Sequence, residues 1–154
     1  MDAQSVKNAS TSGTKGYDNG KRISGIKRHI AVDSQGLPHA IGVTAASVND
    51  RTGALEILEK YKQNMTSVET VLTDGGYTGK PFHDSVSEKI HAIAEIAKRS
   101  ELHKFAVIPK RWVVERSFAW IENRRRCWKN CERLLSSSVG MLQLAFIRIL
   151  LKRF

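Results

Sequence analysis

The sequence contains few cysteines. The two that it has, Cys127 and Cys131, are four residues apart, which would place both on one face of a helix. A disulfide between them is not expected, and a zinc ion would need two further ligands. We therefore expect both thiols to be reduced packing residues of a cytoplasmic protein.

Long apolar runs are also absent. The first residues are polar, and no apolar stretch of the kind found in a secretory signal follows them. The most apolar segment, residues 139–151, is interrupted by Gln143 and Arg148. It is too short to span a bilayer and is typical of a buried helix. We expect neither a signal peptide nor a membrane partner.

Acidic residues are outnumbered by basic ones, 15 to 25, which gives a formal net charge of +10 over 154 residues. This surplus indicates an anionic partner, with nucleic acid first and an acidic membrane surface second. A protein that is simply basic is the alternative. Residues 104–133 carry most of the surplus, with Trp112, Trp120 and Trp128 interleaved. We expect this segment to follow phosphates, and Trp120 and Trp128 to pack mainly in the core.

The apolar periodicity predicts one α/β domain. Strands are expected at 1–7, 23–33, 37–45, 68–73 and 93–97, and helices at 49–63, 79–90, 109–131 and after Ser136–Ser138. The segment 8–20 is expected to be a loop, the strand at 23–33 half-exposed, Asp33 a turn cap, and Asn49 or Asp50 a helix cap. This order matches an RNase H-like fold, in which a mixed sheet of an antiparallel meander plus parallel strands is flanked by helices.

Residues 72–79 form the most informative stretch, because an apolar run ends there in Asp74 and two glycines follow at once. This pattern predicts a buried strand with Asp74 at its carboxyl end, where open α/β sheets place their chemistry. Glycine lacks a Cβ, so a metal ion or phosphate can approach the carboxylate closely. Taken alone, a structural Asp-Gly turn is the simpler interpretation.

Two more acidic residues occupy suitable positions. Asp2 lies on the first strand, and Glu115 lies in the long helix, away from its apolar side. Carboxylates from separate elements can converge on two divalent ions, about 3.5–4 Å apart, that cleave phosphodiesters. The alternative for Glu115 is a solvated helix face paired with Arg111.

Several segments in one order, over nearly the whole chain, carry a family resemblance. They include Asp2-x-x-Ser5-Val6-Lys7, Lys15-Gly16-Tyr17-Asp18-x-Gly20-Lys21, Gly25-x-Lys27-Arg28-His29, Asp74-Gly75-Gly76-Tyr77-x-Gly79, Pro109-x-Arg111-Trp112-Val113-Val114-Glu115-Arg116 and Arg124-Arg125-Arg126. Together they resemble the DDE transposases of bacterial insertion sequences.

The resemblance implies an RNase H-like catalytic domain that hydrolyses DNA and transfers its strands during transposition. It implies Asp2, Asp74 and Glu115 as catalytic residues and as ligands of two Mg²⁺ or Mn²⁺ ions. Many relatives carry Tyr-x2-Arg-x3-Glu-x6-Lys around the glutamate. Here Arg111 and Glu115 fit, whereas Ile108 and Glu122 stand at the tyrosine and lysine positions. The DNA contacts that we expect are Lys7, Lys27, Arg28, Arg111, Arg116, Arg124, Arg125 and Arg126.

Relatives continue upstream of the first aspartate, whereas here only Met1 precedes Asp2. We therefore expect residues 1–154 to be one catalytic domain truncated at the N-terminus, without the DNA-binding region. Its expected partners are DNA, further copies of itself on DNA, and an upstream-frame transposase polypeptide, all in the cytoplasm at the nucleoid. The alternatives are an inactive fragment that only binds DNA or another transposase chain and, with less support, a basic RNA- or ribosome-associated protein.

Overall fold

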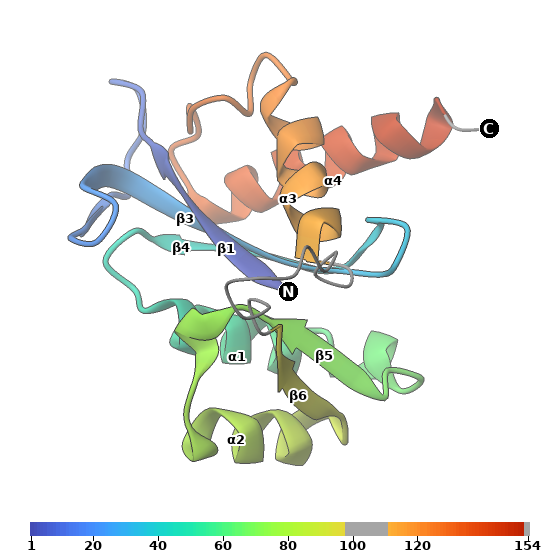
Figure 1. The fold of residues 1–154 in the computed structure, drawn as a ribbon. Coiled ribbons are helices and arrows are strands. Elements are labelled where there is room, and N and C mark those ends of the chain that lie inside the picture. The colour runs from blue at the N-terminus through green and yellow to red at the C-terminus, as the bar shows by residue number, and fades with distance from the viewer. Residues whose placement is uncertain (98–110, 153–154) are drawn as a thin grey trace, which may run out of the picture.

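The structure of the protein, a computed structural model, describes residues 1–97 and 111–152. Within these ranges the chain has a mixed α/β fold with an antiparallel sheet, a parallel strand pair and four α-helices (Figure 1). None of the helices in these ranges is long and apolar enough to cross a membrane. The expected connection at 98–105, Ile108 and the expected helix start at Pro109 lie outside the described residues.

The antiparallel sheet contains the expected meander. β1 (Asp2–Lys7) pairs with β3 (Ile23–Val32), from Asp2 opposite Ile30 to Lys7 opposite Gly25, and β3 pairs with β4 (Pro38–Ala45). In the turn between β3 and β4, Asp33 Oδ1 accepts hydrogen bonds from the backbone of Gln35 and Leu37, as expected. The segment expected to be a loop contains β2 (Gly16–Asp18), which pairs with the start of β3.

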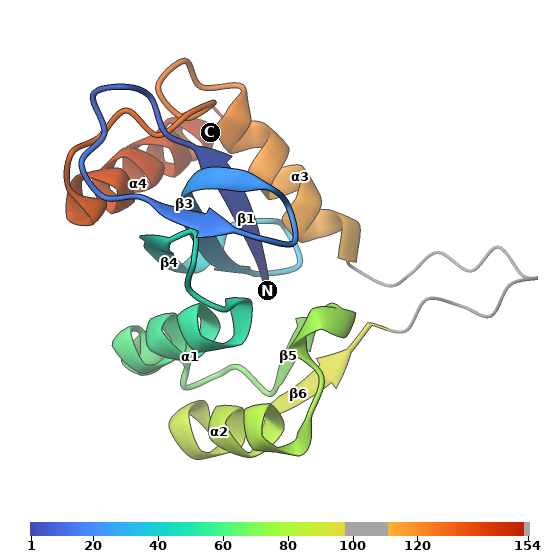
Figure 2. The same cartoon turned by 90° about the vertical axis from the view of Figure 1, so that its left-hand side faces the viewer.

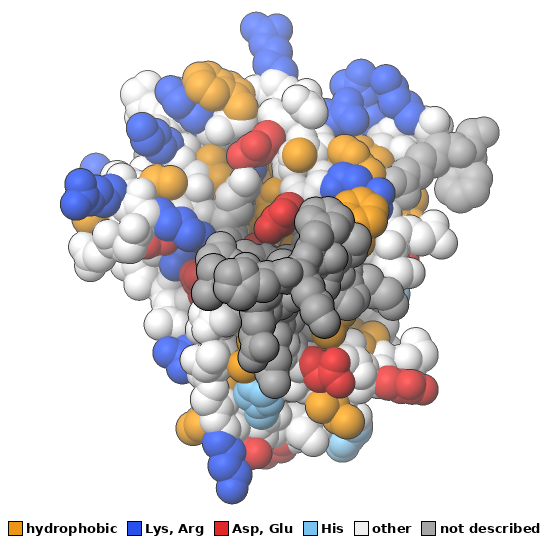
Figure 3. Space-filling model, in the orientation of Figure 1, with side chains coloured by type: hydrophobic (Ala, Val, Ile, Leu, Met, Phe, Trp, Pro, Cys, Tyr) orange, Lys and Arg blue, Asp and Glu red, His pale blue; other side chains and the backbone are white. Residues whose placement is uncertain are grey.

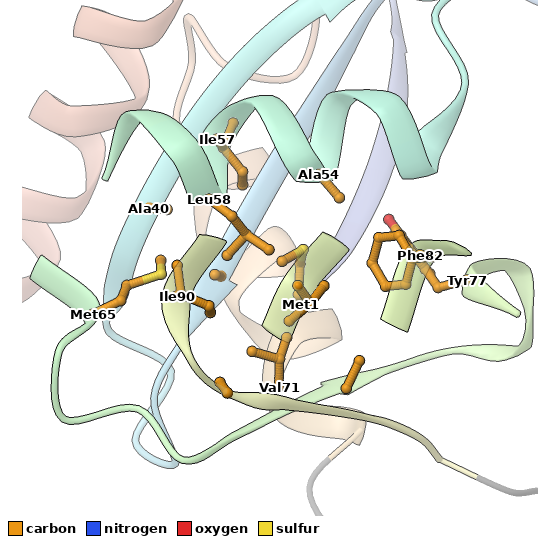
Figure 4. Packing of buried hydrophobic residues seen from close by; sticks show 14 residues of the cluster. Met1, Ala40, Ala54, Ile57, Leu58, Met65, Val71, Tyr77, Phe82 and Ile90 are labelled. Atoms are coloured by element: carbon orange, nitrogen blue, oxygen red, sulfur yellow. The ribbon is translucent and has the colours of Figure 1, made fainter. Parts of the chain in front are cut away.

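The second part of the fold consists of α1 (Asp50–Lys60), a 3₁₀ turn (Lys62–Met65), β5 (Thr70–Thr73), α2 (Lys80–Ile90) and β6 (Ile93–Ile96). Asn49 caps α1 by accepting a 2.9 Å hydrogen bond from the Arg51 backbone, as the sequence indicated. Apolar residues of α1, α2, β5 and the turn after β5 pack into one cluster, which Met1 joins from the start of the chain. Leu58, Val71 and Tyr77 are members of this cluster (Figure 4).

The sequence predicted one mixed sheet, but among the described residues the strands pair as two sheets. β5 pairs with β6 in parallel, and neither is in the ladder of β1, β3 and β4. A link between them is the Met1 ammonium group, which donates a 2.6 Å hydrogen bond to the Leu72 carbonyl. The beginning of β1 therefore lies beside the end of β5 (Figure 2).

The strand expected to be half-exposed is mostly buried, because α1 packs on one face of β3 and α3 on the other. Lys27 and Arg28 are 5% and 2% exposed. Lys27 Nζ lies 2.7 Å from Asp50 Oδ1, and Arg28 Nη2 donates to the Cys127 carbonyl at 2.5 Å. Lys27 and Arg28 were expected to contact DNA, but in this structure their charged groups point into the protein, where Asp50 and the Cys127 carbonyl contact them.

Two helices cover the other face of the antiparallel sheet, and both differ from their expected bounds. α3 (Arg111–Glu122) ends before residue 131, so Cys127 and Cys131 share no helix face; both are free thiols. α4 (Leu135–Leu151) begins before Ser138, whose hydroxyl group donates to Asn130 Oδ1 instead of capping the helix. Trp120 packs against the apolar cluster under these helices, but Trp128 is 60% exposed, contrary to expectation.

The close approach of β1 and β3 depends on Gly25, because a Cβ at this position would overlap the Val6 carbonyl oxygen. We predict that Gly25→Ala lowers the free energy of unfolding by about 1–3 kcal/mol, because two backbones must separate. Urea unfolding followed by circular dichroism measures this change. The matched control is Gly140→Ala in α4, where a Cβ meets no atom within 4 Å. That variant should be unchanged or more stable by up to about 1 kcal/mol, and equal losses in both variants would contradict the register.

Stability should also fall on mild acidification because of His29. This residue is fully buried, its Nε2 lies 2.9 Å from the Thr44 hydroxyl oxygen, and burial lowers its pKa to about 4. Between pH 6.5 and 4, His29 is protonated in the unfolded chain but stays neutral in the folded chain. The free energy of unfolding therefore decreases as the pH is lowered, by up to about 3 kcal/mol.

Urea unfolding at several pH values tests this. His29→Gln should lose most of the slope between pH 6.5 and 4. His91→Asn is the control, because His91 is exposed at φ 56°, a conformation that asparagine tolerates. A slope that survives in His29→Gln would contradict the assignment.

Candidate active site

Asp2 is positioned by β1 and faces α3. Side chains alternate along a strand, so Asp2 and Gln4 lie on the same face. Gln4 Nε2 donates a 2.8 Å hydrogen bond to Glu122 Oε1 of α3, which fixes that face toward the helix. Asp2 itself is half-buried, and its Oδ1 accepts a 2.7 Å hydrogen bond from the Ala3 backbone.

Asp74 directly follows β5, as the sequence predicted, and it caps the short 3₁₀ turn Gly75–Tyr77. Its Oδ1 accepts a 2.9 Å hydrogen bond from the Gly76 backbone. The turn is anchored by Tyr77, which is 1% exposed and has its ring centre 5.5 Å from that of Phe82. Burial of Tyr77 therefore holds the half-buried Asp74 carboxylate at the end of the strand.

Glu115 is exposed on α3, as expected from its place away from the apolar side. Glu122 is seven residues further on, which on an α-helix is the same face about two turns away. Because Glu122 contacts Gln4, this face of α3 runs along β1, and Glu115 lies toward Asp2.

Two neighbouring cavities meet at Asp2. A cavity of about 450 Å³ is bordered by both Asp2 and Asp74, and one of about 320 Å³ is bordered by both Asp2 and Glu115. The structure therefore brings Asp2 near each of the other two carboxylates. Among residues 1–97 and 111–152, however, no three Asp, Glu, His or Cys side chains come together closely enough to hold one metal ion.

The electrostatics of Asp2 agree with the nearness of Asp74. Burial raises the pKa of the Asp2 carboxyl group, and the nearby Asp74 carboxylate raises it further, whereas the Ala3 N–H and Lys21 oppose the change. Lys21 also borders the cavity shared by Asp2 and Glu115, and its Nζ donates to the Ala3 carbonyl at 3.1 Å. The sequence analysis did not name Lys21 as a site residue, because only the fold brings the basic segment that carries it to β1.

The residues that we expected to contact DNA differ in their exposure. Lys7, Arg125 and Arg126 are exposed, Arg124 is half-buried, and Arg126 Nη2 lies 2.7 Å from Glu132 Oε1. Figure 3 shows basic side chains gathered over the upper part of the molecule, around acidic ones near the middle of the face.

Arg116 is half-buried between two tryptophans. Its guanidinium carbon lies 4.4 Å from the ring centre of Trp112 and 4.7 Å from that of Trp120, and its Nη2 donates to the Gln35 carbonyl. Arg111 is the first residue of α3, and its side chain lies outside the described part of the structure. That these residues contact DNA stays a prediction.

Carboxylates at a strand, a strand end and a helix, on a basic α/β protein, are typical of proteins that process nucleic acid. Residues 1–151 match the family described as Transposase DDE domain, and the chain belongs to this family. The resemblance to DDE transposases of insertion sequences is thereby confirmed.

One relative is a protein of Burkholderia cepacia named as an inferred transposase for insertion sequence element IS402. It is 32% identical over 110 residues, which are 66% of this chain and 51% of the relative. The chain thus spans about half the length of the curated relative that it matches. No solved structure matches the chain.

Replacing Asp2 should stabilise the folded protein at neutral pH. A carboxyl group whose pKa is raised by folding opposes folding once it ionises, and this cost disappears at low pH where it is protonated. We predict that Asp2→Asn is more stable than the original chain at pH 7, and that the difference narrows toward pH 4. Urea unfolding at both pH values measures it.

Glu88→Gln is the matched control, because Glu88 is exposed on α2 and borders neither cavity. Its effect should stay within about 0.5 kcal/mol at both pH values. An Asp2→Asn variant that is less stable at pH 7 would contradict the unfavourable burial of the ionised Asp2 carboxylate beside Asp74.

Proposed function

We propose that this chain is the RNase H-like catalytic domain of a transposase that cleaves and joins DNA with Mg²⁺ or Mn²⁺. The observation that carries the proposal is the position of Asp2, which borders one cavity with Asp74 and the next with Glu115. In this proposal the three carboxylates are the catalytic residues, and residues 1–154 form a single domain.

The donor set fits hard divalent cations, which prefer carboxylate oxygens. Burial raises the pKa of Asp2, and repulsion from Asp74 raises it further; a cation between the two carboxylates would relieve that repulsion. Bound ions would supply charge stabilisation and activation of the attacking water or hydroxyl group. Because three ligands do not meet among the described residues, the active arrangement requires Glu115 and Asp2 to approach each other.

Two of the carboxylates are oriented by their neighbours in this proposal. The Gly76 N–H and the buried Tyr77 orient Asp74, and the pairing of β1 with β3 orients Asp2. Lys21, beside Asp2 and Glu115 in the second cavity, is suited to contact a phosphate of the bound strand.

DNA is the proposed partner. The exposed cations Lys7, Arg125 and Arg126, together with Arg124 and Arg116, would bind the phosphate backbone, and Arg111 would do so next to Glu115. We further propose that the protein works in the cytoplasm at the nucleoid as a homo-oligomer on DNA, with another transposase polypeptide as a second partner.

A second candidate function is DNA binding without cleavage. It is favoured by one observation, namely that the three carboxylates do not form a single ion site within the described residues. In that case the chain would bind DNA or another transposase chain through its basic surface, with an affinity that falls steeply with salt.

Plasmid nicking distinguishes the two candidates. We predict nicking that needs Mn²⁺ or Mg²⁺ and that falls at least about 100-fold in Asp74→Asn or Glu115→Gln, because each change removes a ligand of an ion that supplies several kcal/mol. Agarose gels resolve supercoiled from nicked plasmid.

Glu88→Gln serves as the control and should nick like the original chain. Nicking that persists in purified Asp74→Asn would rule out the carboxylate assignment. If the original chain binds DNA but nicks no plasmid with either metal, the binding-only function is the better account.

A further inference from the structure

Trp128 is 60% exposed, although the chain on either side of it is held tightly to the fold. It lies in residues 124–134, which we call the Trp128 segment, between α3 and α4 and beside the end of β1 (Figure 1). An exposed aromatic side chain is common on protein surfaces and by itself indicates nothing. What distinguishes Trp128 is the way it is held and the charges that surround it.

The backbone before Trp128 is fixed by a buried cation. Cys127 is 2% exposed and packs in the apolar cluster under α3 and α4. Its carbonyl oxygen accepts a 2.5 Å hydrogen bond from Arg28 Nη2, and its N–H donates to the Arg124 carbonyl at 2.7 Å. Arg28, which the sequence suggested as a DNA contact, thus holds the Trp128 segment from inside the protein.

The backbone after Trp128 is fixed at the end of β1. Asn130 is 4% exposed; its N–H donates to the Lys7 carbonyl at 2.9 Å, and its Nδ2 donates to Asn8 Oδ1 at 3.0 Å. Trp128 and Lys129 therefore project from between two buried anchors. A side chain presented in this way loses little further backbone freedom when a ligand binds, which favours binding.

Cations surround the exposed ring. The Trp128 segment has five Lys or Arg residues and one Glu, and Arg125 and Arg133 are exposed. Lys129 Nζ lies 4.4 Å from the ring centre of Trp128, so it covers one face of the indole and leaves the other to solvent. An aromatic face among cations is the combination that binds an unpaired nucleic-acid strand, because the cations hold phosphates while the ring stacks on a base.

We propose that Trp128 stacks on an unpaired base of a DNA strand whose phosphates contact the cations of the Trp128 segment. This inference rests on the proposed function for DNA as the partner, and it adds a contact to a base to the contacts with phosphates. Bases inside a duplex are covered on both faces by their neighbours, so the ring reaches only an unpaired one. Every base has an aromatic face, so the contact favours single strands without selecting a sequence.

The Trp128 segment lies at the opposite end of β1 from the candidate active site. Asn130 meets β1 at Lys7, whereas Asp2 is at the other end of the strand. Five residue steps at about 3.4 Å each separate these ends by about 17 Å. Trp128 would therefore contact DNA that flanks the reacting bond, which makes it a binding residue and not a catalytic one.

A second copy of this chain fits the surface less well. In a symmetric pair the same patch meets itself, so the five cations of one copy would face the five of the other. Like charges placed together across an interface cost free energy. A DNA strand instead brings a negative charge with each nucleotide to the same cations. Charge complementarity therefore favours the nucleic acid.

The test measures how the full chain binds a short oligothymidylate and a duplex of equal length, by tryptophan fluorescence and by the anisotropy of labelled DNA. We expect the oligothymidylate to quench the fluorescence of the original chain. Trp128→Ala should lose this quenching and bind the oligothymidylate at least about fivefold more weakly. The slope of log Kd against log salt should not change, because no charge is removed. Affinity for the duplex should change by less than about twofold, because phosphate contacts dominate it.

Two controls separate stacking from the other properties of the surface. Leu134→Ala is the matched control, because Leu134 is 62% exposed in the same segment but has no ring; its affinity should stay within about twofold. Arg125→Ala should lower the salt slope by about 0.7 and keep the quenching. The circular dichroism spectrum should be unchanged in all three variants, since each side chain is exposed.

An oligothymidylate that does not bind, or that binds Trp128→Ala as tightly as the original chain, would overturn the proposal, and so would equal weakening for the duplex. Self-association of the original chain in light scattering, lost in Trp128→Ala, would overturn it in favour of a second copy of this chain. Plasmid nicking keeps this result separate from the proposed function. A chain that nicks without stacking disproves only the stacking, and a chain that stacks without nicking disproves only the cleavage.

Discussion

The pairing of β1 with β3 decides where the first carboxylate lies. Six residues of β1 are in register with β3, and the pairing ends with Asp2 opposite Ile30. At that point the Met1 ammonium group crosses to the Leu72 carbonyl at 2.6 Å. Asp2 therefore stands where the antiparallel sheet gives way to the parallel pair, and this is why it borders one cavity with Asp74 and another with Glu115.

The basic side chains of this molecule fall into two groups, one buried and one exposed. Lys27 is bound to Asp18 and Asp50, and Arg28 Nη2 donates to the Cys127 carbonyl, so both side chains are engaged inside the protein from β3. Removing one partner of such a buried set leaves an uncompensated charge, which is costly. In the proposed function, the exposed cations on the other segments are therefore the ones that would bind DNA, so the net charge of +10 is larger than the charge available for binding.

The sequence was sufficient for features set by local chemistry: the strand ending at Asp74, the Asn49 cap of α1 and the Asp33 turn. It was insufficient where distant residues decide. The polar run Lys27-Arg28-His29 is typical of an exposed segment. Its burial is explained only by partners far along the chain. The pattern of tryptophans suggested a helix through Trp128, but α3 ends at Glu122. Lys21 lies in a basic segment of the sequence, but only the fold places it beside Asp2.

The central claim is that Asp2 joins two ion-binding places, one with Asp74 and one with Glu115. Titration with Mn²⁺, followed by electron paramagnetic resonance of the free ion, tests it without DNA. The account predicts that Asp2→Asn weakens Mn²⁺ binding at least about tenfold, the effect of losing a shared charged ligand, and that Asp74→Asn and Glu115→Gln each have smaller effects. An Asp2→Asn protein that binds Mn²⁺ as tightly as the original chain would contradict it.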